Sequence, residues 1–262
     1  MPNDQKREAF LRSAITAIGP ENAVRLLALA PFGEAAWSLV FSYGEEVETR
    51  YWKEVVPGWL RDDPAEMAKA VEMLMKAWRP RAAFALVKDR PERLPVRTLF
   101  QLLTVMAQDS DDKEGEYLLE HYYVESAFEC INRTSELSLE QKAGLEFVYL
   151  DVLERAWDRR DKSAIPNLER YIEDHPEVLV QAVVWTYKRK DRAEDPPEFK
   201  VEAEKAKPMA ERGFKLIQAL KRIPGSDEHG SVDAERLAKW TETVRKSCAE
   251  LSRLAIADVV IG

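Results

Sequence analysis

Glycine, histidine and cysteine are scarce in this chain, which holds 10, 3 and 2 of them among 262 residues. Backbone loops that bind phosphate are rich in glycine and follow a strand, and no such loop occurs. The two cysteines, Cys130 and Cys248, lie far apart in the sequence and match neither a zinc site nor a redox pair. We expect both to be reduced thiols at apolar helix positions. These shortages exclude a glycine-rich phosphate loop, a disulfide scaffold and a cysteine metal site.

The three histidines, His121, His175 and His229, lie on separate expected elements. A di-metal helical bundle needs Glu-x-x-His motifs on two helices, and the chain has none. No glycine-flanked nucleophile elbow occurs either. We therefore expect a non-enzymatic chain with no catalytic residue, no metal and no cofactor. The alternative of an enzyme without a legible motif stays open, and it predicts a deep polar pocket whose titratable groups have perturbed pKa values.

Long apolar runs are missing too, and the first twenty residues carry five charged side chains instead of the apolar stretch of a signal peptide. We expect a cytoplasmic protein with no membrane contact. Positive charge is in deficit, because the formal net charge is −8. Nucleic-acid binding depends on clustered Lys and Arg side chains. This balance therefore disfavours a nucleic-acid partner and favours a protein partner.

What the chain does have is proline at one expected helix start after another, at Pro20, Pro64, Pro80, Pro95 and Pro176. Proline suits the first turn because the amide it lacks has no partner inside the helix there. Between these prolines, apolar residues recur at three- and four-residue spacing, and no stretch has the pattern of a strand. Short links favour antiparallel helical hairpins. We expect an all-α fold in which such hairpins stack as a short α-solenoid.

Three helix starts carry local signals. Asp63 before Pro64 predicts an N-cap followed by a first-turn proline. That helix is expected to continue through Trp78, whose indole we expect to pack inside the hairpin. The residues 138–141, Ser-Leu-Glu-Gln, match a capping box. Ser163 is expected to cap a short helix that ends at Asp174.

The sequence also predicts a domain boundary. Residues 188–200 combine a run of charges with a Pro-Pro pair, which is typical of an exposed linker. We expect residues 1–192 to form a helical-repeat region and residues 193–262 to form a C-terminal helical segment packed on it. Because the final residues are apolar, we expect this segment to be truncated at its end and the chain to be a piece of a longer protein.

One segment departs from the acidic balance. Between Lys76 and Arg97 the chain has seven cations against only Asp89 and Glu92, an excess of five. This segment could dock an acidic protein or a nucleic-acid backbone. The alternative is structural, because cations favour helix C-termini. Trp59 follows a Pro-Gly break and is expected on the surface, where a tryptophan is a natural interface anchor. The candidate interaction residues are Arg79, Arg81, Lys88, Arg90, Arg93, Arg97 and Trp59.

The C-terminal part carries a resemblance. Residues 223–240 read Ile-Pro-Gly-Ser-Asp-Glu-His-Gly-Ser-Val-Asp-Ala-Glu-Arg-Leu-Ala-Lys-Trp, and residues 78–83 read Trp-Arg-Pro-Arg-Ala-Ala. Together with Tyr51-Trp52, this string resembles the helical C-terminal regions of large, mostly uncharacterised bacterial proteins, some attached to nucleotide-binding domains and linked to phage defence. The resemblance implies an interaction or scaffold module of a bacterial multi-component system and includes no catalytic motif. The alternative of a nucleic-acid-binding helical module that uses the Lys76–Arg97 face stays open.

Overall fold

The computed structural model describes residues 2–19, 22–58, 60, 63–108, 121–153, 163–187, 203–220, 224–227, 229 and 231–251. Within these residues the chain forms fourteen α-helices and no strand, which confirms the expected all-α fold. The chain divides into two compact units, residues 1–136 (unit 1) and residues 137–262 (unit 2). None of the helices seen here is both long enough and apolar enough to cross a membrane.

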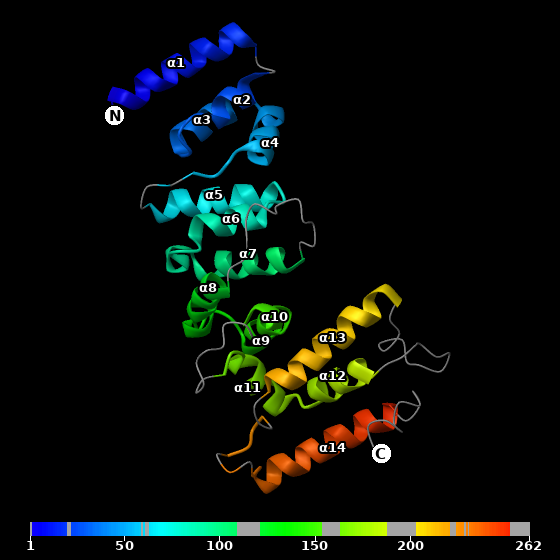
Figure 1. Cartoon of the computed structure of the whole chain (residues 1–262). Coiled ribbons are helices and arrows are strands. Elements are labelled where there is room, and N and C mark those ends of the chain that lie inside the picture. Colours follow the sequence, from blue (N-terminus) through cyan, green and yellow to red (C-terminus); the bar gives the residue numbers. More distant parts are fainter. Residues whose placement is uncertain are drawn as a thin grey trace. The chain divides into compact units, whose positions relative to one another are not determined.

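Unit 1 is built from helices that pack on their neighbours along the chain. α2 packs against α4, and α5, α6 and α7 pack against one another (Figure 1). A short 3₁₀ turn, η2 (Pro91–Arg93), lies between α6 and α7 and packs on α8. The α-helices described in this unit are α1 (Pro2–Ile18), α2 (Ala23–Ala28), α3 (Glu34–Ser42), α4 (Glu45–Glu54), α5 (Pro64–Lys76), α6 (Pro80–Val87), α7 (Val96–Gln108) and α8 (His121–Arg133).

The predicted start of α5 is confirmed. The Asp63 carboxylate accepts hydrogen bonds from the backbone N–H groups of Ala65 (2.9 Å) and Glu66 (3.3 Å), and Pro64 is the first residue of the helix. This cap satisfies two of the backbone donors that a helix start leaves without an intrahelical partner. Pro80 is the first residue of α6 in the same way. α5 and α6 therefore form a hairpin with a very short link.

An aromatic cluster from α3, α4 and the residues before α3 lies in the core of unit 1. The rings of Trp37 and Trp52 are buried, and their centroids lie 5.4 Å apart. Phe32 meets Trp37 edge-on at 5.1 Å, and Tyr51 meets Trp52 edge-on at 5.4 Å. Burial raises the pKa of the Tyr51 hydroxyl to about 12. Aromatic rings prefer such edge contacts and bury large apolar areas, so the cluster anchors α3 to α4.

Unit 2 consists of helices joined by short irregular segments, as far as its described residues show. α12 packs along α13, α9 packs against α11, and α12 also contacts α14. The predicted capping box at the start of α9 is confirmed, because Gln141 N–H donates to Ser138 Oγ (3.1 Å) and Ser138 N–H donates to Gln141 Oε1 (2.9 Å). The α-helices described in this unit are α9 (Leu139–Val148), α10 (Leu150–Leu153), α11 (Pro166–Asp174), α12 (Glu177–Tyr187), α13 (Ala203–Ala219) and α14 (Ala234–Leu251).

The two units meet in sequence at residues 136 and 137, whereas the sequence predicted a boundary between residues 192 and 193. The charged linker that suggested that boundary, residues 188–200, lies outside the described residues, so its role stays a prediction. The helices on either side of it, α12 and α13, pack against each other within unit 2. Gly213 permits this approach, because a Cβ atom there would lie 2.5 Å from the carbonyl oxygen of Ala182.

Candidate functional site

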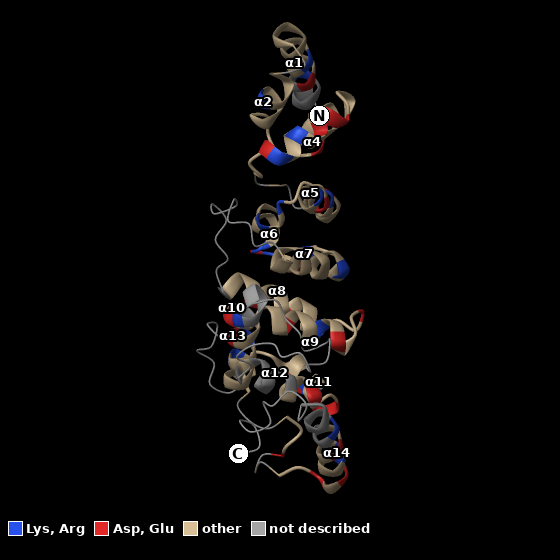
Figure 2. Cartoon of the chain, turned by 90° about the vertical axis from the view of Figure 1, so that its right-hand side faces the viewer, with Lys and Arg blue, Asp and Glu red and all other residues tan. Residues whose placement is uncertain are grey.

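The basic segment, residues 76–97, runs from the end of α5 through α6 and η2 to the start of α7. Its helices pack together in unit 1, so its charges gather on neighbouring elements. In Figure 2, blue stretches lie beside α6 and at the start of α7, whereas α4 and α14 carry blue and red together. Lys76, Arg90 and Arg97 are exposed in this segment. The half-buried cations are Arg79, Arg81, Lys88 and Arg93.

Arg79 has a structural role in the segment. Its Nη1 atom donates hydrogen bonds to the carbonyl oxygens of Val55 (2.7 Å) and Trp52 (3.1 Å). These carbonyls lie at the C-terminus of α4, where a helix leaves acceptors unsatisfied and where its dipole attracts cations. The guanidinium therefore ties the end of α4 to the α5–α6 link. Of the two interpretations that the sequence left open, the structural one describes this side chain.

Other cations of the basic segment also have interactions inside the chain. Lys88 Nζ lies 4.3 Å from the centroid of the Tyr123 ring, which is a cation–π contact. Arg97 Nε lies 3.6 Å from Glu136 Oε2, and because both side chains are largely exposed this ion pair contributes little stability. Each of the remaining arginines has at least one interaction within the chain. They are Arg81, Arg90 and Arg93.

The aromatic surface residue of this region is Trp78. Trp59, the tryptophan expected on the surface, lies outside the described residues. Trp78 was expected to pack inside the hairpin, and that prediction is wrong: its side chain is 80% exposed. It lies beyond the last residue of α5, and its backbone has φ 59°. Because the chain leaves the helix here, the three- and four-residue spacing no longer fixes the direction of the side chain.

The backbone around Trp78 ends α5 in a Schellman motif. Arg79 N–H donates to Leu74 O (2.9 Å), and Trp78 N–H donates to Met75 O (3.0 Å). In this motif one residue takes the left-handed conformation, and glycine usually fills the position because it has no Cβ atom. Here tryptophan fills it. A non-glycine residue in this conformation is strained, and such strain concentrates at functional sites.

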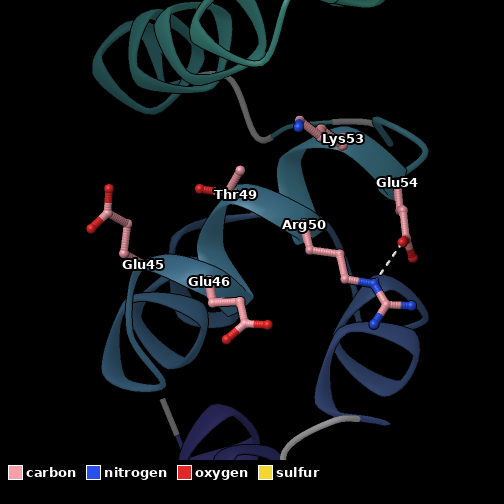
Figure 3. A pocket seen from close by; sticks show the side chains of 6 residues that line it. All are labelled: Glu45, Glu46, Thr49, Arg50, Lys53 and Glu54. Atoms are coloured by element: carbon pink, nitrogen blue, oxygen red, sulfur yellow. Dashed lines mark hydrogen bonds and ion pairs between the residues drawn. The ribbon is translucent and has the colours of Figure 1, made fainter.

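A groove lies along the outer face of α4, with a volume of about 510 Å³. In Figure 3 the Arg50 guanidinium turns toward Glu54, and the Nε–Oε1 distance is 2.7 Å. The Glu54 carboxylate raises the pKa of Arg50. The groove is open to solvent, and its described lining comes from one helix with mixed charges, so it does not enclose a substrate. The lining residues are Glu45, Glu46, Thr49, Arg50, Lys53 and Glu54.

A second groove of about 490 Å³ lies where α11 meets α14 in unit 2. Its charges pair across the two helices: Arg236 Nη1 lies 3.5 Å from Glu173 Oε2, and Lys239 Nζ lies 3.5 Å from Asp174 Oδ1. Trp240 Nε1 also donates to the carbonyl oxygen of Glu173 (2.9 Å). These contacts fasten α14 to the end of α11. Among the residues that the structure describes, no group of three His, Cys, Asp or Glu side chains could hold a metal ion.

The carboxylate of Glu146, on α9, is fully buried at the start of α11. Its Oε1 accepts hydrogen bonds from Asn167 Nδ2 (2.6 Å) and Asn167 N–H (3.3 Å), and its Oε2 accepts one from Leu168 N–H (2.7 Å). Burial raises the pKa of Glu146 to about 7, against the opposing effect of these hydrogen bonds. Because the side chain is closed off from solvent, we assign it to helix capping and not to catalysis.

Glu146 also corrects a prediction about α11. Ser163 accepts a hydrogen bond from Ile165 N–H (3.1 Å), but α11 begins at Pro166, and its N-cap residue makes no side-chain cap bond. The donors in the first turn bind the carboxylate from α9 instead. Nothing local in the sequence marks Glu146 for this role, because its partners lie 21 and 22 residues away along the chain.

Comparison of the chain with models of protein families, with curated proteins and with solved structures gives no significant match.

Proposed function

We propose that this chain is a non-enzymatic protein-interaction module, and that its contact surface includes the basic segment. The observation that carries the proposal is the local reversal of charge. A chain of net charge −8 has an excess of five cations within residues 76–97, and the helices that hold them pack side by side in unit 1. Such a patch attracts an acidic partner and guides its approach.

The finer architecture that we propose is a short α-solenoid of antiparallel helical hairpins. In support, α5 and α6 form a closely linked hairpin, and α7 packs on both of them. Solenoids present extended surfaces made by successive repeats, and these surfaces suit large partners. The resemblance to helical regions of large bacterial proteins is our reason to place the module in a bacterial multi-component system, with antiphage defence as its setting.

Two other functions make different predictions. A nucleic-acid-binding module would use the same basic segment, and its affinity would fall steeply with salt. An enzyme would need a deep polar pocket. The two grooves noted above are open, and the described carboxyl group with a strongly raised pKa, Glu146, is sealed inside unit 2. These observations support the interaction module over an enzyme.

The test is affinity capture of the whole chain from a lysate of the organism that encodes it, with mass spectrometry of the retained proteins. One half of the lysate is treated with nuclease. We expect a protein retained in a fixed ratio to the chain in both halves. Retention that disappears after nuclease treatment would favour the nucleic-acid module, and the absence of any retained protein would contradict the proposal.

A further inference from the structure

Trp78 combines two features that are unfavourable for an isolated chain. Its indole is 80% exposed, and its backbone has the left-handed φ of 59° that favours glycine. Because the indole is exposed, its contacts within the chain stabilise the fold little. They do not offset the free-energy cost of the strained backbone. Glycine at this position would keep the same Schellman motif without the strain. The combination is understandable if the exposed indole serves a contact with another molecule.

The immediate surroundings of Trp78 are cationic and partly apolar. Lys76, two residues earlier, is exposed. Arg79, the next residue, donates a hydrogen bond to the carbonyl oxygen of Val55, and the following residue, Val56, is 71% exposed. The Arg79 contact therefore joins the segment that carries Val56 to the segment that carries Trp78. Two exposed apolar residues lie on these adjoining segments, and Trp78 is within the basic segment.

We propose that Trp78 is the anchor of a docking site for a short acidic peptide segment of a partner protein that also carries an apolar side chain. The proposal rests on the interaction function proposed above and names the chemistry of the partner. Tryptophan is the residue most typical of binding hot spots, and the neighbouring cations complement acidic side chains. A short peptide fits this local patch better than a long polyanion, because the chain as a whole carries a net charge of −8 and repels one.

The test begins with selection of peptides that bind the full chain from a random library displayed on phage. A selected peptide is then labelled with a fluorophore, and its affinity is measured by anisotropy for the full chain and for two variants. Trp78→Gly removes the indole and suits the left-handed backbone. Leu29→Gly is the matched control, because Leu29 is also a large exposed residue just after a helix, at 85% exposure and with an ordinary φ of −86°.

We expect the selected peptides to contain more Asp and Glu than the library and at least one large apolar residue. Trp78→Gly is expected to weaken binding by at least about tenfold while its melting temperature stays equal or rises. Leu29→Gly is expected to keep the affinity. A loss of binding without a loss of folding separates a docking role for Trp78 from a structural one.

Once peptides are selected, any of three results would overturn the proposal: equal affinity of the peptide for Trp78→Gly and for the unchanged chain, no acidic excess in the selected peptides, or displacement of the peptide by an unlabelled single-stranded oligonucleotide. If peptides bind Trp78→Gly unchanged, the interaction function stands and only the anchor is wrong. If no peptide is selected, the acidic-peptide proposal fails. Capture from the lysate then decides separately whether the interaction function fails as well.

Discussion

Arg79 and Glu146 are charged side chains that complete the ends of helices far from them in sequence. Arg79 satisfies carbonyl groups at the end of α4, and Glu146 satisfies amides at the start of α11. The signs agree with the helix dipole, since cations favour C-termini and anions favour N-termini. Arg79 therefore contributes to the stability of unit 1 through hydrogen bonds from a charged group, which are stronger than neutral ones. For Glu146, burial opposes the charged form and raises the pKa to about 7, so its contribution to unit 2 depends on pH.

Replacement of Arg79 by Ala is expected to lower the free energy of unfolding by about 2 kcal/mol, because two carbonyl acceptors lose a charged donor. Urea unfolding followed by circular dichroism measures the change. Lys76→Ala is the control, since Lys76 is an exposed cation in the last turn of α5. If the two variants are equally stable, Arg79 does not hold α4, and its charge is better assigned to a partner.

Glu146 makes the stability of unit 2 depend on pH. Burial raises the pKa of its carboxyl group from about 4.5 to about 7, so the folded protein binds this proton more tightly than the unfolded chain. The contribution of Glu146 to the free energy of unfolding is therefore greatest at acidic pH and declines as the pH rises from about 4.5 to about 7. The full decline corresponds to about 3 kcal/mol.

Glu146→Gln is expected to remove this decline. At acidic pH the variant is expected to be less stable than the unchanged chain by about 1–3 kcal/mol, because an amide NH₂ group replaces one acceptor that faces backbone N–H groups. This difference shrinks as the pH rises, because only the unchanged chain loses stability when Glu146 ionises. Urea unfolding at about pH 5 and about pH 8 gives the change in the free energy of unfolding with pH for the unchanged chain and for the variant. Glu140→Gln serves as control, because Glu140 is an exposed residue of the same helix. Equal slopes for the unchanged chain and Glu146→Gln would show that Glu146 does not titrate in this range.

At the scale of the element, the sequence predicted what short-range chemistry decides. The starts of α5 and α9 follow from Asp63-Pro64 and from the Ser138–Gln141 capping box, because donor and acceptor lie within one turn of each other. The start of α11 could not be predicted in this way, since its cap comes from α9. Trp78 was misjudged because helical spacing was extended past the end of α5. The candidate surface was thus predicted as a charged segment, without its exposed tryptophan.

The pairing of α12 with α13 depends on Gly213. A Cβ atom there would lie 2.5 Å from Ala182 O and 2.9 Å from Thr186 Oγ1. Gly213→Ala is therefore expected to separate the two helices and to lower the free energy of unfolding by about 1–3 kcal/mol, although alanine favours a helix over glycine by about 1 kcal/mol. Urea unfolding measures the net change in the free energy of unfolding that these two opposing effects produce.

Gly144→Ala supplies the matched control for this prediction. Gly144 lies in α9, is exposed, and has no atom within 4 Å of an added Cβ. The same substitution is expected to raise the free energy of unfolding there, by about 0.5–1 kcal/mol. If Gly213→Ala stabilises the protein as Gly144→Ala does, the close approach of α12 and α13 is not maintained in solution.

For the whole molecule, the question is whether local or total charge governs association. The net charge of −8 repels an acidic partner at long range, while the excess of five cations in residues 76–97 attracts it at close range. Screening by salt reduces both effects, and at physiological ionic strength it acts over about 8 Å. Under these conditions a partner responds mainly to the patch that it touches, so the position of a charge matters more than the total.

Two double variants separate these effects with the same change in total charge. Lys76→Glu with Arg90→Glu reverses two exposed cations of the basic segment, and Arg25→Glu with Lys53→Glu reverses two exposed cations elsewhere in unit 1. We expect the first pair to weaken binding of the captured partner by at least about tenfold and the second to change it little. Calorimetry at low and physiological salt measures both. Equal losses would contradict the assigned surface.

The exposed position of Trp78 also means that the intrinsic tryptophan fluorescence of the protein can report on binding at this site. Trp37 and Trp52 emit from the dry aromatic core of unit 1, whereas the indole of Trp78 is in contact with water. Water shifts tryptophan emission to longer wavelength, and small solutes such as acrylamide quench an indole that they can reach. Whatever covers the end of α5 therefore shifts the emission of Trp78 back and protects it from quenching. The chain has seven tryptophans, so the signal of Trp78 is the difference between the unchanged chain and Trp78→Gly, and it follows occupancy of the site without a label.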